Sequence, residues 1–343
     1  VAQRTVEQTL HGCEQDFHRR GVYTASSFPR SCRNNRIVSV ALAGYFMSIE
    51  LATSRIDAIQ DELEAARRKG PLQDIAIPPC PELLARLLAA MSAAEPDLNE
   101  VARIATSDVA MSATLLQAAN RPAYAAGQPV QTIGGAMDRL GLDETAAVMR
   151  RFLTARAIKV TSPHLQNFWE RAAKRVQTMA HLAKALPGMH PDLAQTYGLF
   201  CHVGFPVMMQ SLKGYSGTLV EANARIDRPF IATENANHKT DHAVVGALVS
   251  KVWRLSPVVT AAIRLHHDFE VMRHVDAADP EVTTLVAAGL LSEHLMRRHE
   301  SLEPDAEWVN HGQSALEWLQ LSPSDVLTLE EEIHEALNAA ELG

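Results

Sequence analysis

Apolar residues recur every three or four positions along most of this chain, and that spacing predicts a series of short amphipathic helices. The first clear run extends from about residue 37 and ends in Arg67, Arg68 and Lys69 before Gly70. Because cations stabilise the C-terminal end of a helix and glycine commonly follows it, we expect a helix over 37–70. The strict alternation of half-buried strands and the dipeptides of tight hairpin turns are not evident in the sequence.

Capping residues mark where later helices begin. Such a residue carries a polar side chain that accepts a hydrogen bond from a free helix N–H group, and it is often followed by proline or, three residues later, by glutamate. The pattern occurs at Asp97 with Glu100, at Asp108, at Thr132, at Ser256 with Pro257 and at Ser322 with Pro323. Gly141 is expected to end the helix that begins after Thr132. The sequence therefore predicts an all-α fold of a dozen or so helices with short connections.

Composition indicates a folded, acidic protein. The chain has 343 residues, of which 47% are hydrophobic, and this excludes wholesale disorder. With a formal net charge of −8 the chain lacks the broad basic face of non-specific nucleic-acid binding, so no direct nucleic-acid partner is expected. The best apolar run, Ile37 to Ile49, is too short to span a bilayer, so no membrane partner is expected either. The four cysteines are scattered, which is typical of a reduced cytoplasmic protein.

Histidines are the most distinctive candidates for chemistry, with 15 in the chain and several between residues 238 and 267. On a single helix His238, Asp241 and His242 would share one face, and His242 and His266 are expected to point inward. Inward histidines with an aspartate could ligate a metal ion or form a buried hydrogen-bonded network. Cys201 is more readily interpreted as a small buried thiol than as a nucleophile.

Several motifs, in this order along the chain, together resemble the HDOD domain, a relative of the HD metal-dependent phosphohydrolases. They are Ile77-Pro-Pro-Cys-Pro-Glu-Leu-Leu, Ser107-Asp-Val-Ala-Met, Leu115-Leu-Gln-Ala-Ala-Asn120, Ala136 to Gly141, Phe168-Trp169, Gly198-Leu-Phe-Cys-His-Val-Gly204, Asp241-His-Ala-Val-Val-Gly246, Trp253-Arg-Leu and Ala262-Ile-Arg-Leu-His-His-Asp268. The resemblance implies an HDOD domain over 71–273, with an N-terminal helical half (71–160) and an HD-like half (161–273). We expect residues 1–36 to form a poorly ordered tail and residues 274–343 to form C-terminal helices.

The resemblance also implies that the family's metal site is changed. An active HD site binds metal through a lead histidine, a His-Asp dyad, further histidines and a distal aspartate. Here the lead position holds Arg171, and the dyad position reads Cys201-His202. The distal aspartate falls near Ser292 and Glu293. Because a bridging carboxylate is lost and an arginine is gained, loading a metal becomes less favourable, and we expect a pseudo-hydrolase.

Only His242 and either His266 or His267 match the ligand pattern of the HD relatives. The expected vestigial cleft is lined by Arg171, Cys201, His202, Asp241, His242, His266 and His267. We expect no catalytic residue, no cofactor and no metal. If a metal does bind, His242, His266 and His202 are the expected ligands.

By resemblance, HDOD proteins are bacterial signalling and regulatory modules that act through protein contacts. The first interpretation is therefore a non-catalytic regulatory module whose partner is an unidentified signalling protein. A second interpretation is a divergent metal-dependent phosphohydrolase that acts on a nucleotide or cyclic dinucleotide, with Arg171 as a phosphate clamp. A third is a sensor that binds a nucleotide in the vestigial cleft without turnover. The sequence leaves these alternatives open.

Overall fold

The structure, a computed structural model, describes residues 55–341 apart from residues 69–70, 94, 125–127, 226–227 and 274–278. The tail expected over 1–36 lies outside the described residues, as does the first part of the helix expected over 37–70. The described part of that helix spans residues 55–68. All regular secondary structure in the described residues is helical, and this confirms the all-α prediction.

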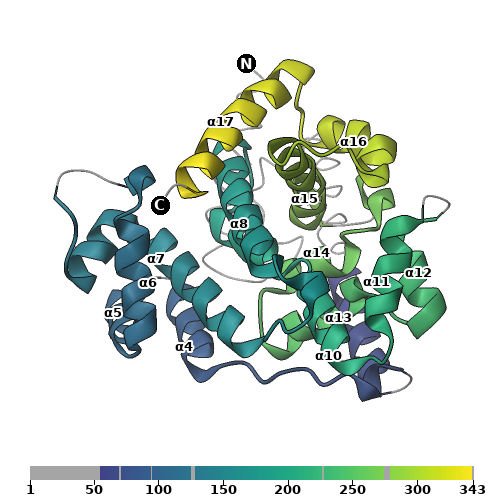
Figure 1. Cartoon of the computed structure of the whole chain (residues 1–343), viewed down its shortest axis with the longest axis horizontal. Helices are drawn as coiled ribbons and strands as arrows, with labels where there is room; N and C mark the ends of the chain where they lie inside the picture. Colours follow the sequence, from purple (N-terminus) through teal and green to yellow (C-terminus); the bar gives the residue numbers. More distant parts are fainter. Residues whose placement is uncertain are drawn as a thin grey trace, which may run out of the picture.

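The helices follow one another with short connections (Figure 1). The α-helices with printed labels are α4 (Glu82–Met91), α5 (Leu98–Thr106), α6 (Val109–Ala119), α7 (Ile133–Ala157), α8 (Phe168–Ala185), α9 (Pro191–Phe200), α10 (Gly204–Ser211), α11 (Tyr215–Ala224), α12 (Phe230–His238), α13 (His242–Val252), α14 (Pro257–Leu265), α15 (Pro280–His299), α16 (Ala306–Trp318) and α17 (Pro323–Glu341). Short 3-10 helices are η2 (Pro71–Asp74), η3 (Pro122–Tyr124), η4 (Pro163–Leu165) and η5 (Phe269–Met272).

Helices α4 to α7 pack on one another and form the N-terminal half of the molecule. Their boundaries follow the predicted caps: Asp97 accepts a hydrogen bond from the Glu100 N–H group, and Asp108 accepts from the N–H groups of Ala110 and Met111. Gly141 adopts φ 76° and ψ 171°, so the helix that begins after Thr132 is interrupted there and α7 continues in a new direction. Glycine enters that region of φ without the steric cost that a side chain brings.

The proline-containing segment before α4 has no regular secondary structure, and one buried tryptophan fixes it to the second half of the molecule. The indole Nε1 of Trp253 donates a hydrogen bond of 2.8 Å to the carbonyl oxygen of Pro78. Trp253 itself is 1% exposed and belongs to the hydrophobic core. Trp169 is half-buried and packs against the same core.

In the expected HD-like half, which contains α8 to α14, α8 packs along α9, and α13 packs against α10 and α14. Helix α8 also packs along α15, the first of the C-terminal helices. Small residues allow these helices to approach closely. A Cβ atom on Gly198 would lie 3.1 Å from the carbonyl oxygen of Arg175, and one on Gly289 would lie 2.4 Å from the hydroxyl of Tyr197. The backbones of α8, α9 and α15 are thereby held near one another around the residues that line the site described below.

The C-terminal helices belong to the same packed body. Helix α15 contacts α8 and α14, α16 contacts α15 and η5, and α17 contacts α8 and also η3 of the N-terminal half. Buried residues such as Leu291, Leu329 and Ile333 extend the shared hydrophobic core into this region. In Figure 1, α15 and α16 lie to the right of α8, and α17 crosses the top of α8 towards its left.

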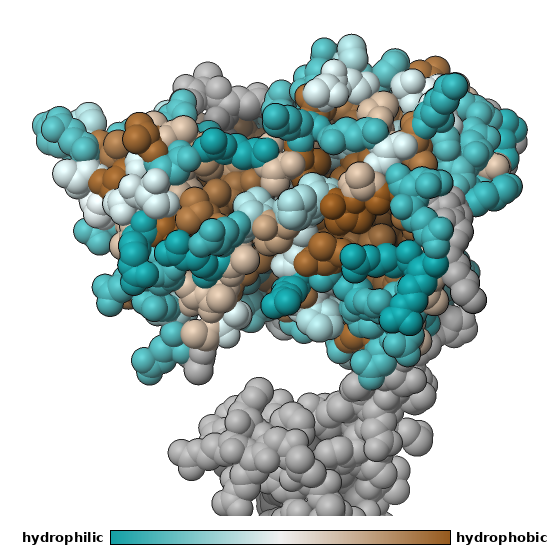
Figure 2. Space-filling view, turned by 90° about the horizontal axis from the view of Figure 1, so that it is seen from below, coloured by the Kyte–Doolittle hydropathy of each residue, from teal (hydrophilic) through white to brown (hydrophobic). Residues whose placement is uncertain are grey.

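The surface is mixed in polarity. In the view of Figure 2, apolar side chains gather in several separate patches that are bordered by hydrophilic ones. Large exposed apolar residues include Val109, Val309 and Leu327, which come from three different helices. Among the described residues, the helices are too short or too polar for any of them to cross a bilayer.

Candidate functional site

A cleft of about 1250 Å³ opens between the helices of the HD-like half and the C-terminal helices. Six of the seven residues expected in a vestigial cleft line it: Arg171, Cys201, His202, His242, His266 and His267. They come from α8, from the turn between α9 and α10, from the start of α13 and from the end of α14. The structure thus gathers residues that are up to 96 positions apart, although their role stays a prediction.

Asp241, the seventh residue, lies outside this cleft and caps a helix. Its side chain accepts a hydrogen bond from the Val244 N–H group and another, of 2.7 Å, from Asn235 Nδ2. The prediction that His238, Asp241 and His242 share one helix face is wrong, because α12 ends at His238 and α13 begins at His242. The chain turns at Lys239, whose φ of 59° is left-handed, and an aspartate before a helix is a strong N-cap.

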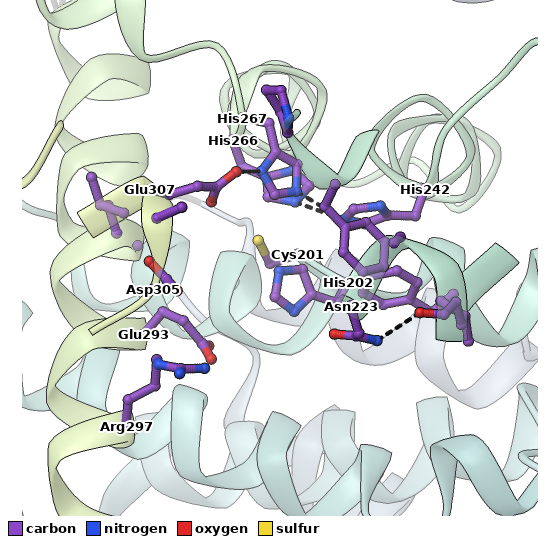
Figure 3. A pocket seen from close by; sticks show the side chains of 18 of the residues that line it. Cys201, His202, Asn223, His242, His266, His267, Glu293, Arg297, Asp305 and Glu307 are labelled. Carbon is purple, nitrogen blue, oxygen red and sulfur yellow. Dashed lines mark hydrogen bonds and ion pairs between the residues drawn. The ribbon is translucent and has the colours of Figure 1, made fainter. Parts of the chain in front are cut away.

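Three imidazole rings meet at one wall of the cleft (Figure 3), and we call His242, His266 and His267 the histidine cluster. The Nε2 atom of His242 lies 3.2 Å from the Nε2 atom of His266 and 3.0 Å from that of His267. His242 and His266 are buried, as their positions in the helical pattern predict, and His267 is half-buried. The cluster therefore presents three ring nitrogens to one small volume.

The opposite nitrogen of each ring is held by an oxygen acceptor. The Nδ1 atom of His242 lies 2.7 Å from a carboxylate oxygen of Glu234, and that of His267 lies 2.5 Å from one of Glu307. The Nδ1 atom of His266 lies 2.7 Å from the carbonyl oxygen of Ile263. Such outer partners fix the tautomer and orientation of an imidazole ring.

Glu234 is fully buried in α12 and is shared among several donors. It accepts hydrogen bonds from the hydroxyl of Tyr215 and from the backbone N–H group of His242, in addition to the ring. Three donors compensate for much of the desolvation of this carboxylate. The start of α13, and with it His242, is therefore fixed from the side away from the cleft.

Cys201 and His202 lie side by side in the turn between α9 and α10. Burial raises the pKa of the Cys201 thiol to about 11, so the thiol is protonated at neutral pH and is not an activated nucleophile. The ring centroid of His202 lies 5.2 Å from that of His266 and 5.6 Å from that of His242. His202 thus borders the histidine cluster without a hydrogen bond to it.

Two arginines of α8, Glu293 of α15 and Glu300, which directly follows α15, form an ion-pair network at the other side of the cleft, which we call the Arg–Glu network. Arg171 pairs with both Glu293 and Glu300, and Arg175 donates to Glu293 over 3.2 Å. Burial would raise the pKa of the Glu293 carboxyl, but Arg175 and Arg171 outweigh it and hold that pKa below its usual value. Arg171, expected at the lead position, and Glu293, near the expected position of the distal aspartate, are thus joined by a salt bridge.

Burial, helped by the positive charges of the cleft, keeps two of its histidines neutral. Burial, followed by the positive charge of Arg175 and of the neighbouring rings, holds the pKa of His202 well below its usual value. Burial and the two other cluster rings do the same for His266. Burial also disfavours the charged form of His267, but Glu307 outweighs it and raises the pKa of that ring.

The model of the HDOD domain family matches residues 77–269, which is more than half of the chain. The chain belongs to the HDOD domain family. This confirms the resemblance drawn from the motifs, and the matched range begins and ends within a few residues of the domain expected over 71–273.

Solved structures share the fold of this HDOD protein. One is a "Putative signal transduction protein" from Marinobacter aquaeolei VT8, with 21% identity, a TM-score of 0.65, and coverage of 83% of this chain and 64% of that one. Another is a "Putative phosphohydrolase" from Shewanella amazonensis SB2B, with 20% identity, a TM-score of 0.60, and coverage of 77% and 93%.

A curated relative, an uncharacterized protein of Treponema pallidum (strain Nichols), is 24% identical over 194 residues. The match covers 56% of this chain and 38% of that protein. The HDOD chain therefore spans less than two thirds of the length of both this relative and the Marinobacter protein.

Three residues of the HDOD site escape prediction from sequence: Arg175, Glu234 and Glu307. Glu234 lies in a polar stretch that resembles an exposed helix, and only the fold shows that it is buried. Glu307 lies on α16, outside the range matched by the family model. Arg175 lies four residues after Arg171, and that helical spacing is the one signal that places both arginines on the same face.

Proposed function

We propose that this HDOD protein is a non-catalytic regulatory module of bacterial signal transduction that acts by binding a signalling protein. The observation that carries the proposal is the Arg–Glu network. It replaces a metal-binding histidine and a metal-binding aspartate, which the resemblance assigns to active HD enzymes, with an ion pair. An arginine in this place repels a cation, and the carboxylate of Glu293 is already bound by two guanidinium groups.

The set of metal ligands that the cleft offers supports the same proposal. Hydrolysis of a phosphodiester by metal ions relies on ligands that hold the ions, activate water and stabilise charge on the transferred group. His202 occupies the place of the bridging carboxylate that the resemblance assigns to active relatives, and a neutral imidazole binds one ion where a carboxylate can bridge two. The site is therefore poorly suited to a two-metal mechanism.

Turnover assays test the non-catalytic part of the proposal. The purified chain is incubated with cyclic dinucleotides, linear dinucleotides and nucleoside triphosphates, with magnesium, manganese, ferrous iron or zinc supplied in turn. We expect the rate to equal that of His242→Gln, in which any metal-dependent chemistry at the histidine cluster is lost. Hydrolysis by the wild type that disappears in His242→Gln and persists in His311→Gln would overturn the proposal, because His311 lines the same cleft outside the cluster.

Partner capture tests the interaction part. The tagged chain is cross-linked in cells of its source and recovered under denaturing conditions, beside a tag-only control. We expect one or a few signalling proteins to be enriched, and we expect the recovered partner to bind the purified chain saturably. Failure of every recovered protein to bind saturably would contradict an interaction role.

A metal-dependent phosphohydrolase is the second candidate, and the histidine cluster is the observation that favours it. Three imidazoles that share one small volume can hold an ion and leave a position for water. The Shewanella protein that shares this fold carries a phosphohydrolase name. The turnover assays separate this candidate from the regulatory one.

A further inference from the structure

The outer contacts of the histidine cluster leave three ring nitrogens facing one another at its centre. Carboxylate and carbonyl oxygens only accept hydrogen bonds, so the Nδ1 atoms of His242, His266 and His267 must each carry a proton. A neutral imidazole has one N–H group, so each Nε2 atom then presents a lone pair. The contacts of 3.2 Å and 3.0 Å between Nε2 atoms cannot be hydrogen bonds among neutral rings.

A cation between the rings would turn this repulsion into bonding. Imidazole nitrogens bind first-row metal ions at about 2.0–2.1 Å, and two such nitrogens around one tetrahedral ion are about 3.3 Å apart. The observed separations of 3.2 Å and 3.0 Å are close to that value. The rings also have the outer-shell partners usual for ligating histidines, namely the carboxylates of Glu234 and Glu307 and the carbonyl oxygen of Ile263.

We propose that the histidine cluster binds a single late first-row transition-metal ion, of the zinc, cobalt or nickel class, as a regulatory ligand. The inference rests on the proposed regulatory function, because the bound ion would be a signal only if the protein is a regulatory module. The donor set consists of imidazole nitrogens, which bind zinc, cobalt and nickel in preference to magnesium or calcium. His267 takes the place that the sequence assigned to His202 in a metal-binding set.

The Arg–Glu network explains why one ion is expected rather than two. A second ion would need hard oxygen ligands on the other side of His202. There Glu293 is bound by Arg171 and Arg175, whose positive charges would repel a further cation. The cleft thus has one side suited to a cation and another side already neutralised by arginine.

Glu307 connects the ion to the C-terminal helices. It lies on α16, in the first turn after the N-cap Asp305, and reaches the ring of His267. Two ring stacks also hold α16 near this point: Trp308 stacks on His294 of α15 at a centroid distance of 3.9 Å, and His311 stacks on Phe269 of η5 at 4.6 Å. An ion that orders the ring of His267 would also strengthen its bond to Glu307, and we expect α16 to be held more firmly when the ion is bound.

The first experiment measures binding itself. The full chain is freed of metal with a chelator, and zinc is titrated by equilibrium dialysis with elemental analysis. Cobalt serves as a second probe, because its absorption spectrum reports its ligands. We expect one equivalent per chain, with binding weakened at least tenfold in His267→Gln and tenfold to hundredfold in Glu307→Gln, which alters only the outer shell. His267 and Glu307 are not fully buried, so both variants are expected to fold, and circular dichroism checks this.

Matched controls separate the cluster from other histidines. His311→Gln and His164→Gln change residues that line the same cleft, and His334→Gln changes an exposed ring whose Nδ1 lies 3.0 Å from that of His299. All three are expected to bind zinc as the wild type does. The inference is overturned if the wild type retains no zinc. In that case a proton on His267 would occupy the place of the ion. It is also overturned if His267→Gln and Glu307→Gln bind as tightly as the wild type.

The second experiment tests the link to α16 by amide hydrogen exchange. Saturating zinc is expected to slow exchange in α16 of the wild type and of His164→Gln, and to leave it unchanged in Glu307→Gln loaded with zinc at a higher concentration. Equal protection in Glu307→Gln would overturn the link. The two proposals fail separately: absence of zinc binding would leave the regulatory function standing, whereas hydrolysis by the zinc-loaded chain would overturn that function and leave the metal site standing.

Discussion

A Cβ atom on Gly204 would lie 2.0 Å from the carbonyl oxygen of His242, so the first turns of α10 and α13 are in direct backbone contact. This contact places the turn that carries Cys201 and His202 against the helix that carries His242. The sequence Cys201-His-Val-Gly204 therefore joins the chemistry of the cleft to a packing requirement three residues later. Gly246, one turn along α13, completes the close approach, since its Cβ would lie 3.4 Å from the Gly204 nitrogen.

Gly204→Ala is expected to destabilise the protein by about 2 kcal/mol or more, because the added methyl group meets backbone atoms that cannot rotate away. Urea unfolding followed by circular dichroism measures the loss. Gly217→Ala is the matched control. Gly217 lies in α11 with nothing within 4 Å of an added Cβ atom, so alanine there should stabilise the helix by about 0.5–1 kcal/mol. Equal effects of the two substitutions would contradict the close contact.

The Arg–Glu network should behave as a coupled unit. Arg171→Met leaves Glu293 and Glu300 with fewer donors, and Glu293→Gln leaves Arg171 and Arg175 with one charge partner fewer. Each single substitution is expected to cost about 2 kcal/mol of unfolding free energy, because hydrogen bonds to charged groups are lost in a half-buried place.

A double-mutant cycle checks this coupling. The variant with both Arg171→Met and Glu293→Gln should be more stable than the sum of the two losses predicts, by about 1 kcal/mol. Strict additivity would show that the two side chains do not interact. The pair Arg264 and Glu62, which is bridged at the surface over 2.8 Å, is the comparison and should show less coupling.

His294 is expected to make stability depend on pH. Burial lowers the pKa of its ring to about 4, and its Nδ1 has no hydrogen-bond partner among the described residues. Below pH 6.5 the unfolded chain binds a proton at this residue that the folded chain does not, so stability falls as the pH decreases from about 6.5 towards 4.

The measurement compares unfolding free energies of the wild type and His294→Gln across that range. The wild type should lose on the order of 2 kcal/mol more than the variant between pH 6.5 and pH 4. Proton NMR should place the titration of this ring near pH 4. The structure indicates that this ring, which stacks on Trp308, is shielded from water. Parallel pH profiles of the two proteins would contradict that shielding.

Local signals in the sequence account for most of the fold. The caps at Asp97, Asp108 and Ser256 act within one helical turn, so each could be identified from its neighbours, and all three accept the expected hydrogen bonds. The sequence does not reveal the break between α12 and α13, because His238 and His242 have helical spacing and a lysine at position 239 does not indicate a left-handed conformation.

The site was only partly predictable, because its outer partners depend on tertiary packing. Motifs identified His242, His266 and His267, but the helix break removed Asp241 from the cleft and gave it a capping role. Glu307 reaches its histidine from 40 residues further along the chain. No periodicity within one helix could show which carboxylate lies behind which ring.

Glu234→Gln is expected to destabilise the protein by about 2 kcal/mol, although the two side chains have nearly the same shape. The carboxylate of Glu234 accepts hydrogen bonds from the Tyr215 hydroxyl and from the ring and backbone of His242. The NH2 group of a glutamine would face at least one of these donors, and that hydrogen bond would be lost. A buried polar group that loses its partner costs about 1–3 kcal/mol.

Tyr215→Phe is the companion variant, because it removes one donor and leaves the carboxylate intact. Its cost should be about 1 kcal/mol, smaller than that of Glu234→Gln, since two of the three donors remain. Urea unfolding of both variants and of Glu335→Gln, an exposed residue of α17, decides the matter. If Glu234→Gln proved as harmless as Glu335→Gln, the carboxylate would not hold the start of α13, and the orientation assigned to the His242 ring would lose its support.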